Sequence, residues 1–518
     1  MLRGWQSRVG LLWPGIGLAG SLSAAVSATG LLARRPVRWW WVASVGTHGV
    51  QWHIFWAGVI LLCLAWVGLG RQVSRRADVR PADLIWVGAL WSVPLLLGPP
   101  LFSLDMYSYL AQGAVLAHGL NPYHYAPQAL HEPQLLAGVS STWKHTTTPY
   151  GPVFVGLAAL VSLVAGSHLA LGVALLRIPE LAGMALLAWS VPRLARRLGA
   201  DPRRATWLAV ISPLSLLYLV AGGHNDALMV GLMIAGVTLA VERRPVAAIA
   251  LCALAATIKL PAAVAVVMIA ICWWREEPGR WRQIIAFAGM VSAGVVLVAG
   301  LVTGVGVSWI SGSLFSTPAT ARMALTPSTA VAVTLWEITH RFGSGVEQAA
   351  ATWENAATWA AFVVVGLVAL WFCGRVRHAT LARWLGAALI VAALGGPAAW
   401  PWYLSWGVVL LAADPRAQSS LWLPVTLVIC VLPVMVGGQV AVPLPDSWWM
   451  VVIYAAAVSV ALLSAGVRRD RRKLAAPGEG SPSRAASRPV APAARAPAAP
   501  SPIGHVPGEP DPVLTKVG

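Results

Sequence analysis

Charged residues are scarce in this chain of 518 residues. Asp, Glu, Lys and Arg make up 11% of it, whereas 58% is hydrophobic. So few charges cannot give a water-soluble protein of this length a polar surface. Apolar stretches long enough to cross a hydrocarbon core of about 30 Å recur along the sequence, and such segments are helical. The sequence therefore predicts an all-α, polytopic membrane helical bundle of about 13–14 spans.

Cysteine is also scarce. The five cysteines, Cys63, Cys252, Cys272, Cys373 and Cys430, lie within or at the ends of apolar stretches and follow no recognisable spacing. Neither a disulfide framework nor a cysteine-based metal motif is supported by this pattern. We expect these side chains to be small residues of the helix interior.

Basic residues exceed acidic ones, 37 to 19, and the formal net charge is +18. The arginines fall in short clusters between apolar spans, which is the pattern of cytoplasmic loops and argues against a nucleic-acid partner. The clusters are Arg71 to Arg80, Arg193 to Arg204, Arg243 and Arg244, Arg275 to Arg282, Arg375 to Arg383, and Arg468 to Lys473. The apolar stretch Val9 to Leu32 has no small-x-small cleavage context, so we expect a retained span there.

The arginine clusters fix the predicted direction of each crossing. A span from about Asp83 to Leu101 runs outward and the span ending at Arg193 runs inward, so both ends of 102–170 are external. The apolar segment Gly151 to Gly166 is then expected to lie along the outer interface or to form a re-entrant helix.

Two further segments are expected to turn at the external face. Val246 to Trp274 has arginines at both ends, which predicts two short spans turning at Lys259-Leu260-Pro261, where the proline breaks the helix. Gly222 to Asp226 lies between an outgoing and an incoming span. The external stretch 303–352 is expected to contain an interfacial helix at Ser328 to Phe342, and two more spans precede the chain's cytoplasmic end.

Six sequence blocks occur in a fixed order, and together they resemble a known family. They are Asp-Met-Tyr-Ser-Tyr-Leu-Ala-Gln-Gly (105–113), Gly-Leu-Asn-Pro-Tyr (119–123), Thr-Pro-Tyr-Gly-Pro (148–152), Gly-Gly-His-Asn-Asp-Ala-Leu-Met (222–229), Ile-Lys-Leu-Pro (258–261) and Pro-Trp-Tyr-Leu-Ser-Trp (401–406). The chain resembles the actinobacterial polyprenol-phosphomannose-dependent α-1,6-mannosyltransferases of the GT-C superfamily, across 50–465. Members often carry a basic residue before the aspartate, where this chain has Leu104.

This resemblance implies a multi-pass glycosyltransferase of the plasma membrane with its active site on the extracytoplasmic face. The donor implied is polyprenyl-phosphomannose, and the acceptor is the α-1,6-mannan of a lipomannan-type glycolipid. The implied domains are two N-terminal transmembrane helices at 1–82, a GT-C catalytic module at 83–303, a loop and transmembrane helices at 304–467, and a disordered cytoplasmic tail at 468–518, where Ala, Pro and Ser predominate.

The family's inverting displacement needs one base and a cation. Asp105 is the predicted base for the acceptor hydroxyl. Lys259, Arg177 and Arg322 are the predicted donor-phosphate ligands, since charge that develops on the leaving phosphate needs a cation. Lys259 also has the alternative of snorkelling to the interface. Glu180, three residues after Arg177, is at a spacing that allows a helical ion pair.

The remaining candidates are polar and aromatic residues expected near Asp105. They are Tyr107, Tyr109, Asn121, His224, Asn225, Asp226, Trp402 and Tyr403. The three at 224–226 can instead orient Asp105 or cap the following helix. The tyrosines and Asn121 of the first loop have packing and turn formation as their alternative, and the aromatic pair at 402–403 has interfacial anchoring.

Three alternatives stay open. No obligatory metal or other cofactor is expected, because the Asp-Met-Tyr run holds one carboxylate and Glu132 is its one acidic partner nearby in the loop, although some GT-C enzymes use a divalent ion. A transporter or flippase for a lipid-linked substrate fits the broken spans and the intramembrane lysine, but the charges gather at one face and no internal repeat is present. The third alternative is the same transfer reaction with another sugar carried on polyprenyl phosphate.

Overall fold

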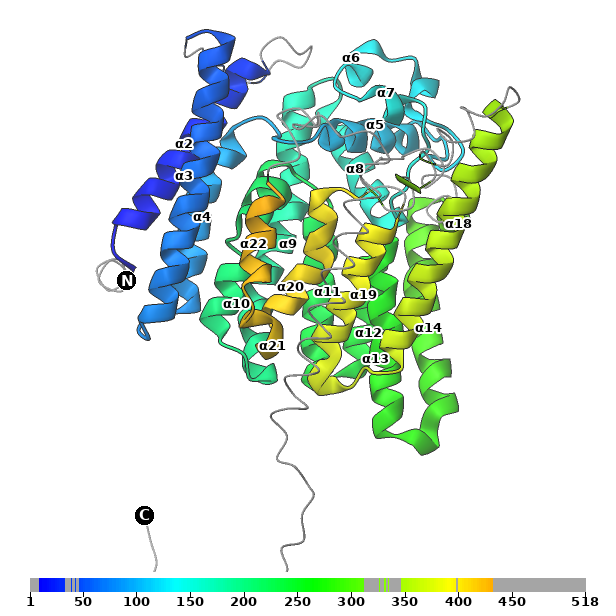
Figure 1. Cartoon of the computed structure of the whole chain (residues 1–518). Helices are drawn as coiled ribbons and strands as arrows, with labels where there is room; N and C mark the ends of the chain where they lie inside the picture. The colour runs from blue at the N-terminus through cyan, green and yellow to red at the C-terminus, as the bar shows by residue number, and fades with distance from the viewer. Residues whose placement is uncertain are drawn as a thin grey trace, which may run out of the picture. The chain divides into compact units, whose positions relative to one another are not determined.

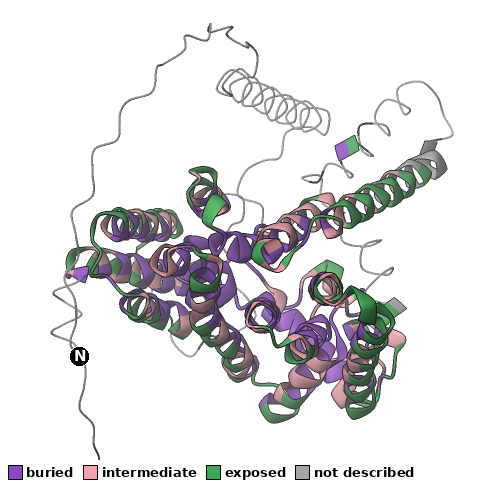
Figure 2. Ribbon diagram, turned by 90° about the horizontal axis from the view of Figure 1, so that it is seen from below, coloured by how far each residue is buried: buried purple, intermediate pink, exposed green. Residues whose placement is uncertain are grey.

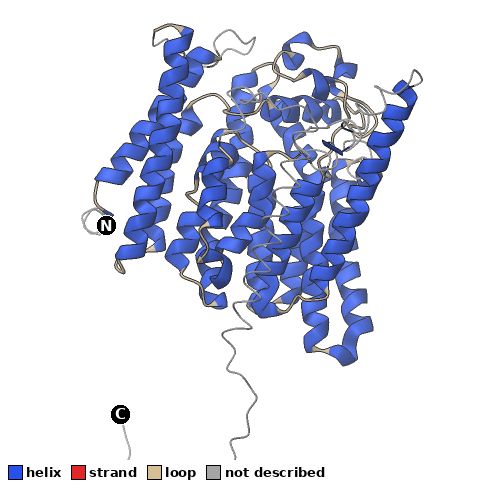
Figure 3. Cartoon of the chain, viewed as in Figure 1, coloured by secondary structure: helices blue, strands red, loops and turns tan. Residues whose placement is uncertain are grey.

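The computed structural model describes residues 9–32, 39, 42, 46–311, 326, 330–331, 334, 346–396 and 399–431. Within these residues every regular element is a helix and no strand occurs (Figure 3). The predicted all-α class is confirmed. Arg322, most of the expected interfacial helix at Ser328 to Phe342, the last two predicted spans and the tail lie outside the described residues.

The longer helices are α2 (Leu12–Leu31), α3 (His48–Arg75), α4 (Pro81–Leu97), α5 (Asp105–Ala117), α8 (Pro152–Ala165), α9 (Leu169–Leu198), α10 (Pro202–Ala209), α11 (Asp226–Val241), α12 (Pro245–Ala256), α13 (Ala263–Glu276), α14 (Trp281–Thr303), α18 (Val346–Cys373), α19 (Leu381–Gly395), α20 (Ser405–Ala412) and α22 (Trp422–Ile429) (Figure 1). Short elements are η1 (Pro127–Leu130), α6 (Pro133–Leu136), α7 (Ser141–Lys144), η2 (Ser215–Ala221), η3 (Leu260–Ala262), η4 (Pro278–Arg280), α15 (Ser308–Ser311), η6 (His378–Thr380), η7 (Pro401–Leu404) and α21 (Pro415–Gln418). Many of these helices begin at proline. The N–H groups of a first helical turn have no acceptor within the helix, so proline can lack this group there without losing a hydrogen bond.

Five helices in the described part of the chain are long and apolar enough to cross a membrane. They are His48–Arg75, Leu169–Leu198, Pro278–Thr303, Asn355–Cys373 and His378–Gly395. The bent pair formed by η2 and α11 makes a sixth if it is counted as one broken span. A multi-pass membrane protein is thereby confirmed. The total of about 13–14 spans stays a prediction, because α4 and α12 are shorter apolar helices and other segments follow residue 431.

The predicted breaks at the site are present. The chain bends by 114° between η2 and α11, at Gly222 to Asn225. A second break at 257–262 separates α12 from α13, and these two helices pack against each other. Helix α8 has 14 residues, which gives a length of about 21 Å. It is therefore too short to cross a core of about 30 Å alone, as expected for Gly151 to Gly166.

The helices form a bundle with a layer of short elements at one end. Helices α2, α3 and α4 lie side by side, and α5 to α8 gather at the end of the bundle drawn uppermost (Figure 1). Seen along the bundle, buried residues fill the spaces between helices and exposed ones cover the outside (Figure 2). Many of these exposed side chains are large and apolar, as expected of a surface that faces lipid.

Helices α9 and α11 meet at glycines, and this contact positions the start of α11. A Cβ atom on Gly183 would lie 2.2 Å from the Ala227 carbonyl oxygen, and one on Gly231 would lie 2.4 Å from the Gly183 carbonyl oxygen. Both obstacles are backbone atoms, which cannot turn away as a side chain does. Glycine is therefore required for the two helices to approach this closely.

Replacing Gly183 with valine is expected to destabilise the protein by roughly 1–3 kcal/mol, the usual cost of overpacking. The measurement is the midpoint of thermal unfolding of the purified chain in detergent. Gly289→Val is the matched control, because a Cβ on Gly289 of α14 meets nothing within 4 Å. Equal midpoints for the two variants would contradict the close-contact argument.

Two tryptophans join α3 to α10 reciprocally. The Trp66 indole donates to the Trp207 carbonyl at 3.0 Å, and the Trp207 indole donates to the Trp66 carbonyl at 2.8 Å. Their rings are stacked with centroids 4.4 Å apart. Each indole thus satisfies a backbone acceptor while burying its ring.

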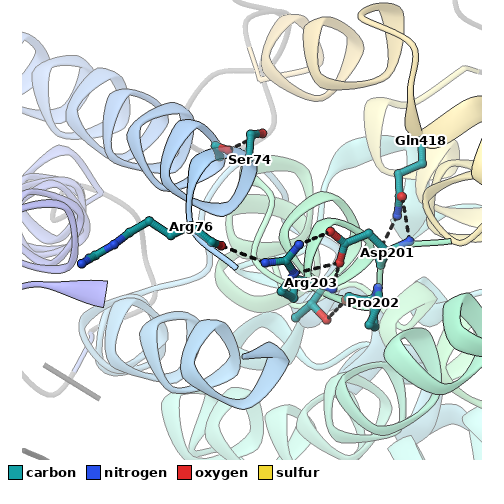
Figure 4. A network of polar contacts seen from close by, with 8 residues as sticks. Ser74, Arg76, Asp201, Pro202, Arg203 and Gln418 are labelled. Carbon is teal, nitrogen blue, oxygen red and sulfur yellow. Dashed lines mark hydrogen bonds and ion pairs between the residues drawn. The ribbon is translucent and has the colours of Figure 1, made fainter. Parts of the chain in front are cut away.

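A polar network holds the loops at the lower end of the same helices (Figure 4). The Arg203 guanidinium donates to both carboxylate oxygens of Asp201 and to the Arg76 carbonyl. The Gln418 side chain accepts from the Asp201 N–H at 3.0 Å and donates to the Asp201 carbonyl at 2.8 Å. These contacts connect the end of α3, the start of α10 and α21.

Candidate active site

Asp105 is the first residue of α5, and the loop before it is tightly held. The Leu101 N–H donates to the Ala221 carbonyl at 3.0 Å, and the Ser103 hydroxyl accepts from the Asp105 N–H at 3.0 Å. Phe102 between them is fully buried and has a φ of 62°, a conformation that costs free energy for a residue with a side chain. The loop therefore fixes where the Asp105 carboxylate begins.

His224 lies directly behind Asp105. Its Nδ1 is 3.3 Å from Asp105 Oδ2, and the His224 side chain is fully buried while that of Asp105 is 16% exposed. The imidazole stacks on Trp402, with ring centroids 3.9 Å apart. Gly223 makes this approach possible, since its φ is +67° and a Cβ there would lie 2.3 Å from the Met106 sulfur. The carboxylate thus has a buried, ring-clamped neighbour and a face open to a substrate.

A buried ion pair lies on the adjoining break. Lys259 Nζ donates to both oxygens of Asp226, at 3.0 and 2.9 Å. The Trp406 indole also donates to Asp226. Asp226 is fully buried and the Lys259 side chain is 12% exposed. Because Pro261 interrupts the helix there, Lys259 leaves the helical path and reaches the first turn of α11.

Aromatic rings surround the Lys259 ammonium. Its Nζ lies 4.4 Å from the ring centroid of Tyr403, 5.3 Å from that of Trp406 and 5.8 Å from that of Tyr150. Distances below about 6 Å allow cation–π attraction. The rings and Asp226 together surround the Lys259 side chain, which is 12% exposed.

The Thr-Pro-Tyr-Gly-Pro block, which contains Tyr150, is hydrogen-bonded to the break between α12 and α13. The Gly151 N–H donates to the Ile258 carbonyl at 2.9 Å, and the Val153 N–H donates to that of Thr257 at 3.2 Å. A Cβ on Gly151 would lie 2.1 Å from the Thr257 oxygen, so only glycine fits. Burial raises the pKa of Tyr150 well above its usual value, and the negative charges of Asp105 and Asp226 raise it further. The Thr-Pro-Tyr-Gly-Pro block is thus held against the break that carries Lys259.

The other predicted residues of α5 face inward. The Tyr109 hydroxyl lies 3.5 Å from both the side-chain oxygen and the backbone nitrogen of Asn225. Its ring packs edge-on against Tyr150, 5.0 Å between centroids. Tyr107 is buried, and its ring is the obstacle to a Cβ on Gly138. Tyr109 and Asn225 thus pack together with Tyr150 beside Asp226, whereas Tyr107 packs against the loop that follows α5.

Two predicted ligands have contacts elsewhere. The Asn121 side chain accepts from the Tyr123 N–H at 3.0 Å and donates to Ser308 at 3.2 Å, as a turn residue does. The buried Arg177 guanidinium donates to the carbonyls of Leu96 and Gly98 at the end of α4. These contacts favour a structural role for both residues.

Sequence reasoning did not select Tyr150 or Trp406 as site residues, although each belongs to one of the six blocks. It also gave Glu180 only as a partner for Arg177. In the structure Glu180 is fully buried and neither of its carboxylate oxygens has a hydrogen-bond partner. No pair within 4.0 Å joins it to Arg177 among the described residues. For Tyr150, the sequence signal that could have selected it was its position between Pro149 and Gly151 in the Thr-Pro-Tyr-Gly-Pro block.

No group of three or more His, Cys, Asp or Glu side chains is placed to hold a metal ion in the described part of the chain. Asp105 contacts His224, whereas the Asp226 carboxylate is engaged by Lys259 and Trp406. Metal dependence stays a prediction.

Comparison with known proteins places the chain in a family. The family model for the N-terminal domain of α-(1→6)-mannopyranosyltransferase matches residues 9–275. α-(1→6)-Mannopyranosyltransferase A of Mycobacterium tuberculosis is 36% identical over 71% of both chains. The enzyme of the same name from Corynebacterium glutamicum is 35% identical over 51% of this chain and 58% of its own, and a probable member from Mycolicibacterium smegmatis is 31% identical over 69% of both. No solved structure matches. The chain belongs to the α-(1→6)-mannopyranosyltransferase family.

Proposed function

We propose that this membrane protein transfers mannose from polyprenyl-phosphomannose to the α-1,6-mannan of a lipomannan-type glycolipid. Its relatives named α-(1→6)-mannopyranosyltransferases support mannosyl transfer. The observation that carries the proposal is the partly open Asp105 carboxylate beside the Lys259–Asp226 pair, since transfer from a phosphate donor needs a base and a cation.

The reaction is an inverting single displacement. The acceptor hydroxyl oxygen attacks the anomeric carbon of mannose, and the bond from that carbon to the phosphate oxygen breaks. Asp105 accepts the hydroxyl proton, and polyprenyl phosphate leaves with the bonding electrons. Because a phosphate leaves as a stable anion, no protein acid is required.

Lys259 is the group that we assign to the leaving phosphate. An ammonium has three N–H donors, and two of them point to the carboxylate of Asp226. We assign the third to the phosphate, since the Lys259 side chain keeps 12% of its surface exposed. Asp226 and the aromatic rings hold the ammonium in place before the donor binds, so little reorganisation is needed when phosphate charge develops.

Other predicted residues hold Asp105 and Lys259 in position. His224, clamped by Trp402, orients Asp105. Tyr109, Asn225 and Tyr403 shape the walls of the site. Arg322 stays a candidate for the donor phosphate as the sequence predicts, whereas the contacts of Arg177 with the carbonyls of Leu96 and Gly98 favour a structural role for it. The arginine pattern supports an extracytoplasmic site in the plasma membrane.

The donor is tested with membranes that contain the chain and a short α-1,6-mannoside as acceptor. Polyprenyl-phosphomannose is expected to support mannose transfer, whereas GDP-mannose and polyprenyl-phosphoglucose are not. Host membranes without the chain are the control. Transfer from GDP-mannose alone would overturn the lipid-linked donor, and equal transfer of glucose would overturn the assigned sugar. Donor movement across vesicles without transfer would favour the flippase alternative.

A further inference from the structure

A second polar site lies at the end of the bundle away from Asp105. A cavity of about 820 Å³ opens there between the end of α13 and the segment that joins α18 to α19, lined by residues that include Arg275, Glu276, Arg375, Arg377 and His378. Helix α13 begins beside Lys259 and continues for 14 residues, a distance of about 21 Å. Figure 1 shows these two ends of the bundle. The cavity is therefore separate from the candidate active site.

Two of the lining residues already have partners. Arg275 donates to the carbonyls of Cys373, Gly374 and Val376, which are left without helical partners where α18 ends. Glu276 pairs with Arg243 and lies 3.0 Å from His378 Nε2. The one carboxylate that lines the cavity is thus already matched by the Arg243 guanidinium.

Arg375 and Arg377 are not matched in this way. In the part of the chain that the structure describes, neither guanidinium pairs with an acidic side chain. The Arg375 guanidinium lies 3.4 Å above the ring of Trp371 and donates to the Trp371 carbonyl. Stacking fixes this group and leaves its outer N–H donors available. Two exposed cations therefore face one cavity with no compensating charge.

An apolar ridge leads to these arginines along α18. Leu367, Leu370 and Trp371 are 61%, 67% and 51% exposed. A tryptophan at the end of such a ridge is typical of a membrane–water interface. Cations directly after an exposed apolar ridge match a ligand with an anionic head and apolar chains.

We propose that this cavity binds the phosphate-bearing headgroup of an anionic phospholipid, with its acyl chains along Leu367 and Leu370. Arg375 and Arg377 donate to the phosphate oxygens, a geometry that guanidinium groups favour. Basic pockets between helix ends bind anionic headgroups in this manner. The arginine clusters predict this end to be cytoplasmic, so the lipid belongs to the inner leaflet.

The test measures lipid binding to the purified full-length chain by native mass spectrometry, with phosphatidylglycerol and phosphatidylcholine as probes. Phosphatidylglycerol is expected to bind in preference to phosphatidylcholine. The variant Arg375→Gln/Arg377→Gln is expected to lose roughly 25-fold in affinity, or about fivefold per arginine. Arg282→Gln is the matched control, because this exposed arginine lies at the same end but does not line the cavity.

Each outcome has one meaning. Equal binding of the two lipids, or unchanged binding by the double variant, would overturn the proposal. Competition by sn-glycerol 3-phosphate as strong as that by the lipid would assign the cavity to a soluble phosphate and overturn the lipid. Unfolding midpoints of the variants in phosphatidylcholine should equal that of the unmodified chain, so that lost binding is not lost folding.

Discussion

Asp105→Asn is expected to lower kcat/KM for mannose transfer by at least about 100-fold, the contribution typical of a general base. The asparagine has nearly the same shape and cannot accept the proton of the acceptor. The loss should fall on kcat with little change in KM, because the interaction is made in the transition state. The measurement is initial-rate transfer from polyprenyl-phosphomannose at matched expression.

Glu132→Gln is the control for this variant. Glu132 lies in the loop that follows α5, has a side chain that is 46% exposed and pairs with His118. Its neutralisation removes the same charge without touching the site, so transfer should be unchanged. The Asp105→Asn protein should also keep its unfolding midpoint, because among the described residues the polar contact of the carboxylate is with His224 alone. A variant that transfers at the normal rate would make Asp105 a structural residue.

The second large effect concerns Lys259 and Asp226, for which stability and activity should separate. Removing one partner of a buried pair typically costs 3–5 kcal/mol, because an uncompensated charge is left behind. We therefore expect Lys259→Met and Asp226→Asn each to unfold at a lower temperature and to transfer little mannose. The double variant should recover most of the stability, since neither charge remains.

Transfer should not recover in that double variant, because the cation for the leaving phosphate is still missing. Recovery of both properties would show that the pair only holds the helix break together. The Arg383–Asp414 pair is the matched control, with its charges 2.8 Å apart and Asp414 buried. This pair does not touch Lys259 or Asp226, so Arg383→Met and Asp414→Asn should each lower stability without altering transfer per folded molecule.

The sequence predicted the breaks at the site better than the contacts across it. Arginines at both ends of 246–274 require an even number of crossings, and Pro261 supplies the turn, so the position of Lys259 followed from charge and backbone chemistry alone. The polar turn at Gly222 to Asp226 was located in the same way. Both predictions rest on residues that are close together in the sequence, so they can be made without knowing how the helices pack.

Contacts between distant segments had no such signal. The Asp226 partner Trp406 is 180 residues away, and indole donors look the same in sequence whether they anchor at an interface or satisfy a buried carboxylate. Arg177 was predicted as an external phosphate ligand on charge and topology. Its use as a clamp on the carbonyls of Leu96 and Gly98 depends on how α4 ends beside α9, which no spacing within α9 reveals.

The reciprocal tryptophan pair has a consequence for biogenesis. Trp66 and Trp207 are 141 residues apart, and at 5–20 residues per second the ribosome needs roughly 7–28 s to make that interval. Throughout it, α3 is inserted without the partner for its indole and without the stack that covers its ring. Helix α3 must therefore wait in the bilayer, held by its contact with α2, which also packs against α4, until α10 is made.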